Sequence, residues 1–343
     1  MPSVVGKFAR PLPAAARGVF RLLRPSRIAA VVLIFVVPIA LANWRAVFLH
    51  TLSIPSYIGF YERHADISYG VLPRQSLDVY MPSGGVSDRP TVVFWHGGGW
   101  YWGSKEQYRF VGAALANSGY VAILPNYRLF PEARFPQFID DGALAVRWVR
   151  EHAREFGGDP GAIFLMGHSA GGHLAAMLAL DDRYLQKVGG SSSWIRGWIA
   201  ISAPYEWKWT LPDMHVVFGW RPIDEWRPIA HVSNRAPPAL LIHGLEDPKL
   251  HPREAVHMAE ALRSAGVPVE CHIYWGGHMA PVLALSPLLR FEARTLADVR
   301  EFVDRAVAAG ATSEPGFSHP CPSVRGRKSW DRPLPQPWLI EDP

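Results

Sequence analysis

The sequence predicts an α/β fold, in which a mostly parallel sheet carries helices on both faces. Three observations support this. Short apolar runs typical of buried strands alternate with longer segments of helical periodicity. The two most glycine-rich motifs each follow one of these apolar runs directly. The chain has 343 residues, of which 49% are hydrophobic, and this is enough to build one large core.

The predicted elements follow this alternation along the chain. The predicted strands lie at 91–95, 162–166, 239–243 and 267–274, and the predicted helices at 105–118, 138–155, 172–180, 254–265 and 290–308. Residues 204–238 interrupt the pattern with four tryptophans, Trp207, Trp209, Trp220 and Trp226. We interpret this segment as a small cap insertion whose aromatic side chains wall a substrate pocket or pack in the cap's own core.

The motif Gly-His-Ser-Ala-Gly at 167–171 lies between a predicted strand and a predicted helix. In this context Gly-x-Ser-x-Gly is the nucleophile elbow of α/β-hydrolases. The sharp turn strains the serine backbone and points its hydroxyl out of the sheet, towards the positive end of the helix dipole. Ser169 is therefore the predicted nucleophile, and the expected fold is the α/β-hydrolase fold.

The motif His-Gly-Gly-Gly-Trp at 96–100 follows another predicted strand. Cleavage of an ester or amide passes through an oxyanion, which needs backbone N–H donors held in place beforehand. Glycines allow the chain to come close enough to supply them. We predict an oxyanion hole formed by the N–H groups of Gly98, Gly99 and Ala170, the residue after the nucleophile.

An acid and a base are expected after the serine, in that order. The loop behind the predicted strand 239–243 contains Asp247, the predicted acid, with Glu246 as the alternative. The turn behind the predicted strand 267–274 ends in His278, the predicted general base. His278 would take the proton of the serine hydroxyl and return it to the leaving group, while Asp247 orients the imidazole.

From about residue 67 to 307 the chain resembles the hormone-sensitive-lipase-like and feruloyl-esterase-like branch of α/β-hydrolases. The motifs that carry the resemblance lie at 96–100, 126–132, 167–172, 243–247 and 276–278. The tryptophans beside the glycine motif are similar to those of kynurenine formamidases and prenylcysteine methylesterases. The resemblance implies hydrolysis of small to medium acyl or aryl carboxylic esters without a cofactor, with cleavage of aryl formamides as the alternative.

The substrate site is predicted beside the oxyanion loop. Trp100 and Tyr101 follow the glycines, and His168 precedes the nucleophile, so we expect these three side chains to contact a small-molecule ester with apolar or aromatic groups. No metal is predicted, because the chain contains no Cys-x-x-Cys pair and no His-x-x-x-His helix with a third ligand.

The net charge of +5 does not indicate a nucleic-acid partner. The first 27 residues hold six basic residues and no acidic one, and the remainder of the chain is close to neutral. An uncharged apolar run of 17 residues follows at 28–44. We interpret 28–49 as a signal anchor or, alternatively, a cleaved signal peptide. Either one predicts a cytoplasmic N-terminus at 1–27 and a catalytic domain at 53–310 on the extracytoplasmic side, membrane-anchored or, after cleavage, secreted or periplasmic.

The last segment, 311–343, is rich in proline, serine and glycine and carries charges of both signs. This composition is typical of a disordered tail. The oligomeric state is not predicted by any of these patterns.

Overall fold

The computed structural model describes residues 44–85, 87–207 and 214–309. The chain divides into two compact units, 1–51 and 52–343. Residues 44–51, which belong to the helix α4 (Trp44–Leu52), are what is described of the first unit. The apolar run at 28–43 and the predicted tail at 311–343 lie outside the described residues. Among the described helices, none combines the length and apolar character needed to cross a membrane.

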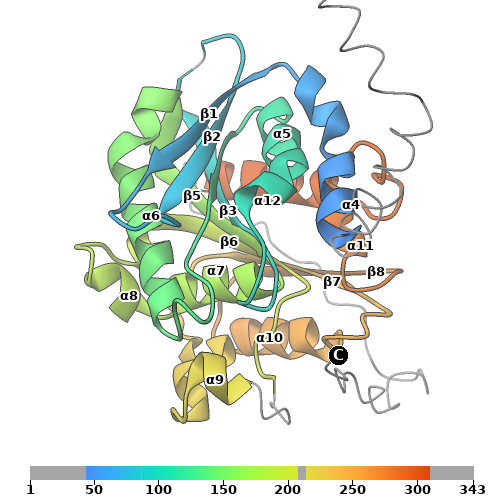
Figure 1. Ribbon diagram of the computed structural model, residues 1–343. Helices are drawn as coiled ribbons and strands as arrows, with labels where there is room; N and C mark the ends of the chain where they lie inside the picture. Colours follow the sequence, from blue (N-terminus) through green and yellow to red (C-terminus); the bar gives the residue numbers. More distant parts are fainter. Residues whose placement is uncertain (1–43, 86, 208–213, 310–343) are drawn as a thin grey trace, which may run out of the picture. The chain divides into compact units, whose positions relative to one another are not determined.

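An eight-stranded sheet forms the centre of the second unit (Figure 1). Its strands are β1 (Tyr61–Ser68), β2 (Ser76–Pro82), β3 (Arg89–Trp95), β4 (Val121–Pro125), β5 (Gly158–His168), β6 (Ile195–Ile201), β7 (Ala239–Gly244) and β8 (Val269–Tyr274). The order across the sheet is β1-β2-β4-β3-β5-β6-β7-β8. The pairs from β4 to β8 are parallel, whereas β1 and β2 are antiparallel additions at one edge.

Helices connect these strands. The α-helices of the second unit are α5 (Arg109–Asn117), α6 (Gln137–His152), α7 (Ala170–Leu180), α8 (Asp182–Gln186), α9 (Met214–Phe218), α10 (Arg253–Ser264), α11 (Ala280–Leu283) and α12 (Thr295–Ala309). Short 3₁₀ turns add η2 (Ile54–Ile58), η3 (Lys105–Tyr108), η4 (Ala153–Phe156), η5 (Ser192–Trp194), η6 (Ile223–Glu225) and η7 (Pro228–His231).

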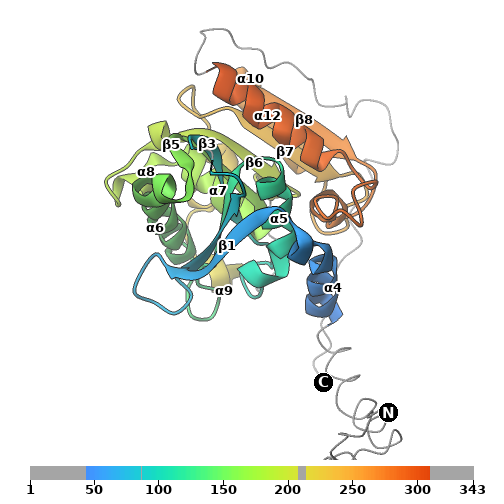
Figure 2. The same cartoon turned by 90° about the horizontal axis from the view of Figure 1, so that it is seen from above.

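Both faces of the sheet are covered by helices. On β6, Gly197 lies against Phe302 of α12, whereas Ala200 lies against Gly172 of α7. These two strand positions differ by an odd number, so they point to opposite faces and the two helices lie on opposite sides. In Figure 2, α12 runs along the sheet beside β6 and β7. The predicted α/β-hydrolase architecture is confirmed.

Two local predictions differ from the structure. The helix predicted at 290–308 begins only at Thr295, because residues 286–292 form hydrogen-bonded turns instead. Four strands, β1, β2, β4 and β6, were not among the predicted strands. The insertion at 204–238 contains α9, η6 and η7, between β6 and β7.

Candidate active site

Three loops at the carboxyl edge of the sheet meet at one point. Ser169 follows β5, Asp247 lies in the loop after β7, and His278 lies in the turn after β8. Because these strands are parallel and belong to one run of neighbours, their carboxyl ends share an edge. The structure therefore brings together the three residues predicted as nucleophile, acid and base.

Ser169 occupies a strained backbone conformation. Its φ is 52° and its ψ is −119°, a combination that residues with a side chain rarely adopt. A side chain at Gly171 would place a Cβ 2.2 Å from the backbone oxygen of Trp95, so only glycine fits beside the turn. The N–H of Ser169 donates to the carbonyl of Ile201 at 2.8 Å, which ties the turn to β6.

His278 joins the nucleophile to the acid. Its Nε2 lies 3.0 Å from the Ser169 Oγ, and its Nδ1 lies 2.6 Å from the Asp247 Oδ2. Burial lowers the pKa of His278, and the hydrogen bond to Asp247 only partly opposes this effect. The imidazole is therefore neutral around pH 7, with an Nε2 lone pair ready to accept the serine proton.

Asp247 accepts three hydrogen bonds and lies beside a second histidine. The backbone N–H groups of Lys249 and Leu250 donate to Oδ1 at 2.8 and 3.0 Å. His278 and a second histidine, His243, both face Oδ2, and the His243 Nε2 lies 3.1 Å from it. Burial alone would raise the pKa of Asp247, but the ring nitrogens of His243 and His278 hold it well below its ordinary value.

The role of His243 was not predicted from the sequence. This residue is fully buried at the end of β7, and its Nε2 also lies 2.9 Å from the carbonyl oxygen of Leu250. A signal was present, since His243 stands four residues before the predicted acid, but a strand-end histidine gives no indication of where its ring points. In the structure, His243 contacts the side chain of the acid, Asp247.

The glycine loop has the backbone geometry expected of an oxyanion hole. Gly98 has a φ of 133°, and a Cβ on it would lie 1.9 Å from the backbone oxygen of Trp102. Gly99 also has a positive φ, 61°. Neither of these N–H groups, nor that of Ala170 at the start of α7, donates to an acceptor in the part of the chain that the structure describes.

Aromatic stacking and hydrogen bonds hold the glycine loop in place. The ring of His96 stacks on Tyr127 at a centroid distance of 4.5 Å, and the Tyr127 hydroxyl donates to the His96 carbonyl at 3.0 Å. Burial lowers the pKa of His96 to about 3, so its ring is neutral and carries no charge into the site. Next to it, the side chain of Asn126 accepts the backbone N–H of Lys105 at 2.7 Å.

The residues predicted to contact substrate lie in three different environments. Trp100 is buried, with its ring 4.9 Å from Phe218 and 5.2 Å from His173, and it lines a cavity under the cap. Tyr101 is 40% exposed and packs edge-on against Phe130. The contact of Trp100 and Tyr101 with substrate stays a prediction.

His168 requires a correction. Its ring is buried, and both ring nitrogens face protein atoms: Nδ1 lies 3.2 Å from the hydroxyl of Tyr108, and Nε2 lies 3.3 Å from the carbonyl oxygen of His278. The prediction that it contacts substrate is wrong, because its ring turns back under the loop of the base. Its position supports His278 instead.

In the described residues, no group of three or more histidine, cysteine, aspartate or glutamate side chains could hold a metal ion.

Comparison with known proteins agrees with this geometry. A family model described as BD-FAE matches residues 77–191, and a model of the prolyl oligopeptidase family matches residues 139–306. Esterase 2 of Thermogutta terrifontis, solved after phosphorylation by paraoxon, superposes with a TM-score of 0.60 at 26% identity, covering 72% of this chain and 94% of that one. The chain has the α/β-hydrolase fold.

Two curated relatives of this α/β-hydrolase chain carry esterase names. An isoprenylcysteine α-carbonyl methylesterase of Arabidopsis thaliana is 28% identical, over 68% of this chain and 60% of the relative. Esterase LipC of Mycobacterium tuberculosis is 32% identical, over 60% of this chain and 56% of the relative. The chain spans 60%, 49% and 62% of the length of three plant methylesterases that it matches.

Proposed function

We propose that the protein is a serine carboxylesterase that cleaves small to medium acyl or aryl esters through an acyl-enzyme on Ser169. The observation that carries the proposal is the chain of contacts from the Ser169 Oγ through His278 to Asp247, at 3.0 and 2.6 Å. The three backbone N–H groups of Gly98, Gly99 and Ala170 lie in the adjoining loop and helix start. The esterase names of the relatives support the same chemistry.

In the first half-reaction, the Ser169 oxygen attacks the ester carbonyl carbon while its proton passes to the Nε2 of His278. The carbonyl oxygen becomes an oxyanion that accepts hydrogen bonds from the backbone N–H groups. The imidazolium is stabilised by the Asp247 carboxylate. The intermediate then collapses, the carbon–oxygen bond to the alcohol breaks, and the proton on Nε2 leaves with the alcohol.

In the second half-reaction, water takes the place of the alcohol. His278 removes a proton from the water as it attacks the acyl-enzyme, and a second oxyanion forms in the same place. Collapse returns the proton to Ser169 and releases the carboxylic acid. The neutral state of His278, which burial favours, is the form needed to begin both halves.

The test compares the purified full chain with its Ser169→Ala variant, using p-nitrophenyl esters of increasing acyl length. We expect ester turnover in the wild type and a loss of roughly 10⁴-fold or more in the variant. A fluorophosphonate probe should label the wild type but not Ser169→Ala, and Ser191→Ala, a surface serine change, should behave as the wild type. Ester turnover that survives in Ser169→Ala would overturn the assignment of the nucleophile.

The alternative is an arylformamidase, which would use the same triad and differ in the leaving group. The nitrogen of an aryl formamide is a poorer leaving group than an alkoxide or phenoxide, so it depends more on the proton from His278. N-formylkynurenine belongs in the same assay. Efficient turnover of this formamide together with weak ester turnover would favour the alternative over the esterase.

We further propose that residues 28–49 anchor the protein in a membrane, with residues 1–27 in the cytoplasm and the catalytic domain on the extracytoplasmic side. The support is the uncharged apolar run that directly follows six basic residues. Fractionation of cells that express the chain with a C-terminal tag should place it with the membranes, and external protease should digest it. A tagged product that starts after residue 42 would indicate a cleaved signal, and a full-length soluble chain would contradict both forms of the proposal.

A further inference from the structure

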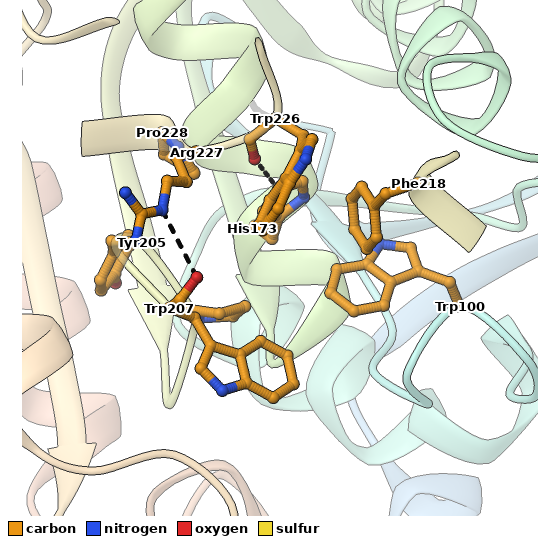
Figure 3. A pocket seen from close by; sticks show the side chains of 9 residues that line it. Trp100, His173, Tyr205, Trp207, Phe218, Trp226, Arg227 and Pro228 are labelled. Carbon is orange, nitrogen blue, oxygen red and sulfur yellow. Dashed lines mark hydrogen bonds between the residues drawn. The ribbon is translucent and has the colours of Figure 1, made fainter. Parts of the chain in front are cut away.

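A cavity lies under the cap, beside the oxyanion loop (Figure 3). It encloses about 180 Å³ including its mouth, and its wall includes Trp100, His173, Tyr205, Phe218, Trp226 and Arg227, which together we call the cap pocket. This figure includes space that is open to solvent, so the cap pocket is narrow, and the chemistry of its wall says more about a ligand than its volume does.

The two ends of the cap pocket differ in chemistry. Trp100 and Phe218 form one end, with ring centroids 4.9 Å apart, and Arg227 and Tyr205 lie at the other end (Figure 3). His173 stands between them on α7, one helical turn after the nucleophile. An apolar chain that enters past the tryptophan therefore meets a cationic and a phenolic group at its far end.

Arg227 is a largely buried cation that the protein pairs poorly. Its side chain is 12% exposed, and the nearest carboxylate, on the exposed Asp224, lies 3.9 Å away, beyond hydrogen-bonding distance. Its Nε makes one long hydrogen bond, 3.4 Å, to the carbonyl of Trp207. Its Nη2 is buried with no hydrogen-bond partner in the described part of the chain. Buried charges in proteins are normally paired, because an unpaired one loses its hydration without compensation.

Tyr205 offers a second donor. Its hydroxyl is buried and, within the described residues, has no hydrogen-bond partner. Burial holds its pKa well above the ordinary value, so the hydroxyl keeps its proton and can donate it to an anion. The nearby Glu254 does not occupy this donor, since its carboxylate accepts the backbone N–H groups of Tyr205 and Glu206, both at 2.7 Å.

His173 fixes where along the cap pocket an anion can lie. Its Nε2 lies 2.7 Å from the carbonyl oxygen of Trp226 and donates to it, which leaves Nδ1 as an acceptor with a lone pair. Burial lowers the pKa of this ring to about 4, so it is uncharged at neutral pH. A carboxylate beside Nδ1 would be repelled, whereas one at the Arg227 end would meet two donors.

The position of the base indicates which part of the ester enters the cap pocket. The leaving alcohol must lie near the Nε2 of His278, which delivers its proton. No residue of the His278 turn lines the cap pocket, whereas Trp100 directly follows the glycine loop that would hold the carbonyl oxygen. The acyl group is thus the part that faces the cap pocket.

We propose that the cap pocket binds a carboxylate at the far end of the substrate's acyl group, through Arg227 and Tyr205, so that the preferred substrates are half-esters of short dicarboxylic acids. This inference rests on the proposed esterase function and names its substrate class. It assigns Arg227 and Tyr205 as specificity-determining residues.

The experiment measures kcat/KM for matched ethyl esters by pH-stat titration with the full chain. Monoethyl succinate and monoethyl glutarate carry the carboxylate, and ethyl butyrate and ethyl pentanoate are the neutral counterparts. We expect the half-esters to be preferred, Arg227→Gln to reduce that preference roughly 10- to 100-fold, and Tyr205→Phe to reduce it roughly 3- to 10-fold. Arg221→Gln changes an exposed cap arginine paired with Glu225 and should leave the preference unchanged.

A binding measurement keeps the inference independent of turnover and of variant folding. Tryptophans line the cap pocket, so the fluorescence of the Ser169→Ala protein should change saturably with monoethyl succinate and not with ethyl butyrate. Hydrolysis of the neutral esters at equal or higher efficiency than the half-esters would overturn the inference while the esterase function stands. If no ester is hydrolysed, the proposed function fails, and absence of saturable succinate half-ester binding would then overturn the inference as well.

Discussion

Asp247 and Arg227 are two buried charges that the protein treats in opposite ways. The carboxylate of Asp247 accepts hydrogen bonds from two backbone N–H groups and from His278, and His243 lies 3.1 Å from it. The guanidinium of Arg227 has one long hydrogen bond and a carboxylate 3.9 Å away. The first charge is fixed before any substrate arrives, as an electrostatic role in catalysis requires. The second leaves a donor free for a ligand. The protein itself supplies all the partners of the catalytic acid, whereas the guanidinium of Arg227 would gain its partner only when a substrate binds.

The largest effect should come from neutralising the charge that is fully satisfied. Asp247→Asn keeps the shape of the side chain but removes the charge that fixes the tautomer of His278. We expect kcat to fall roughly 10⁴-fold with little change in KM. Steady-state kinetics on a p-nitrophenyl ester, with circular dichroism to verify folding, checks this. A loss of less than tenfold would mean that Glu246, the alternative acid, supports the base.

Gly98→Ala should come next, because it disturbs the loop that carries the oxyanion donors. The new Cβ would lie 1.9 Å from the carbonyl oxygen of Trp102, and the backbone φ of 133° is one that alanine disfavours. We expect a drop in kcat of roughly 10²- to 10³-fold. Gly189→Ala is the matched control, since its φ of 79° is also positive but its Cβ meets no atom within 4 Å. Equal losses in both variants would assign the effect to backbone strain alone.

His243 tests whether the donors around Asp247 act on the base. His243→Phe keeps a ring in the buried site but removes the N–H that faces the carboxylate. The presence of His243 contributes to the lowered pKa of His278, so its loss should raise that pKa. Because only the neutral imidazole accepts the serine proton, the acid limb of kcat/KM should move to higher pH, so that the loss of kcat/KM is larger at pH 6 than at pH 8.

His243→Gln provides the rescue for that variant, since its amide can again donate towards Asp247. We expect its acid limb to lie between those of the wild type and His243→Phe. Should both variants lose thermal stability while their pH profiles coincide with that of the wild type, His243 would have a purely structural role. A pH–rate profile from pH 4 to 9 separates the two readings.

The smallest effect is expected at Tyr108, which contacts the triad only through His168. Tyr108→Phe removes the hydroxyl that lies 3.2 Å from the Nδ1 of His168, whose other nitrogen faces the loop of His278. One neutral hydrogen bond contributes about 1 kcal/mol, so kcat/KM should fall no more than about fivefold. A much larger loss would show that the support of the base depends on a single hydroxyl and would weaken the contrast drawn between the two regions.

The catalytic triad could be predicted from the sequence because each of its residues stands in a short, recognisable sequence pattern. Ser169, Asp247 and His278 each stand a few residues behind a strand-like run, and parallel strands bring their ends together. The partners of these residues are not local in this sense. His168 and His278 lie 110 residues apart, and the direction of the His168 ring is decided by packing against Tyr108. This is why the sequence assigned His168 to the substrate and missed its support of the base.

The cap shows the same limit more strongly. Its tryptophans indicated an aromatic pocket. The residue pattern does not show that Arg227 and Tyr205 line the same end of this pocket, or that His173 lies between them and Trp100. These groups meet only after the chain has left β6 and returned to β7. Short-range periodicity predicts helices and strands, whereas contacts between residues far apart in the sequence depend on how those helices and strands pack.

The contact between His173 and Trp226 ties the cap to the helix of the nucleophile. The same histidine donates its backbone N–H to the carbonyl of Ser169 at 3.0 Å and its ring N–H to the cap. One residue thus touches both the reacting serine and the floor of the cap pocket. The cap and the turn that holds the nucleophile are therefore linked through one residue by two hydrogen bonds.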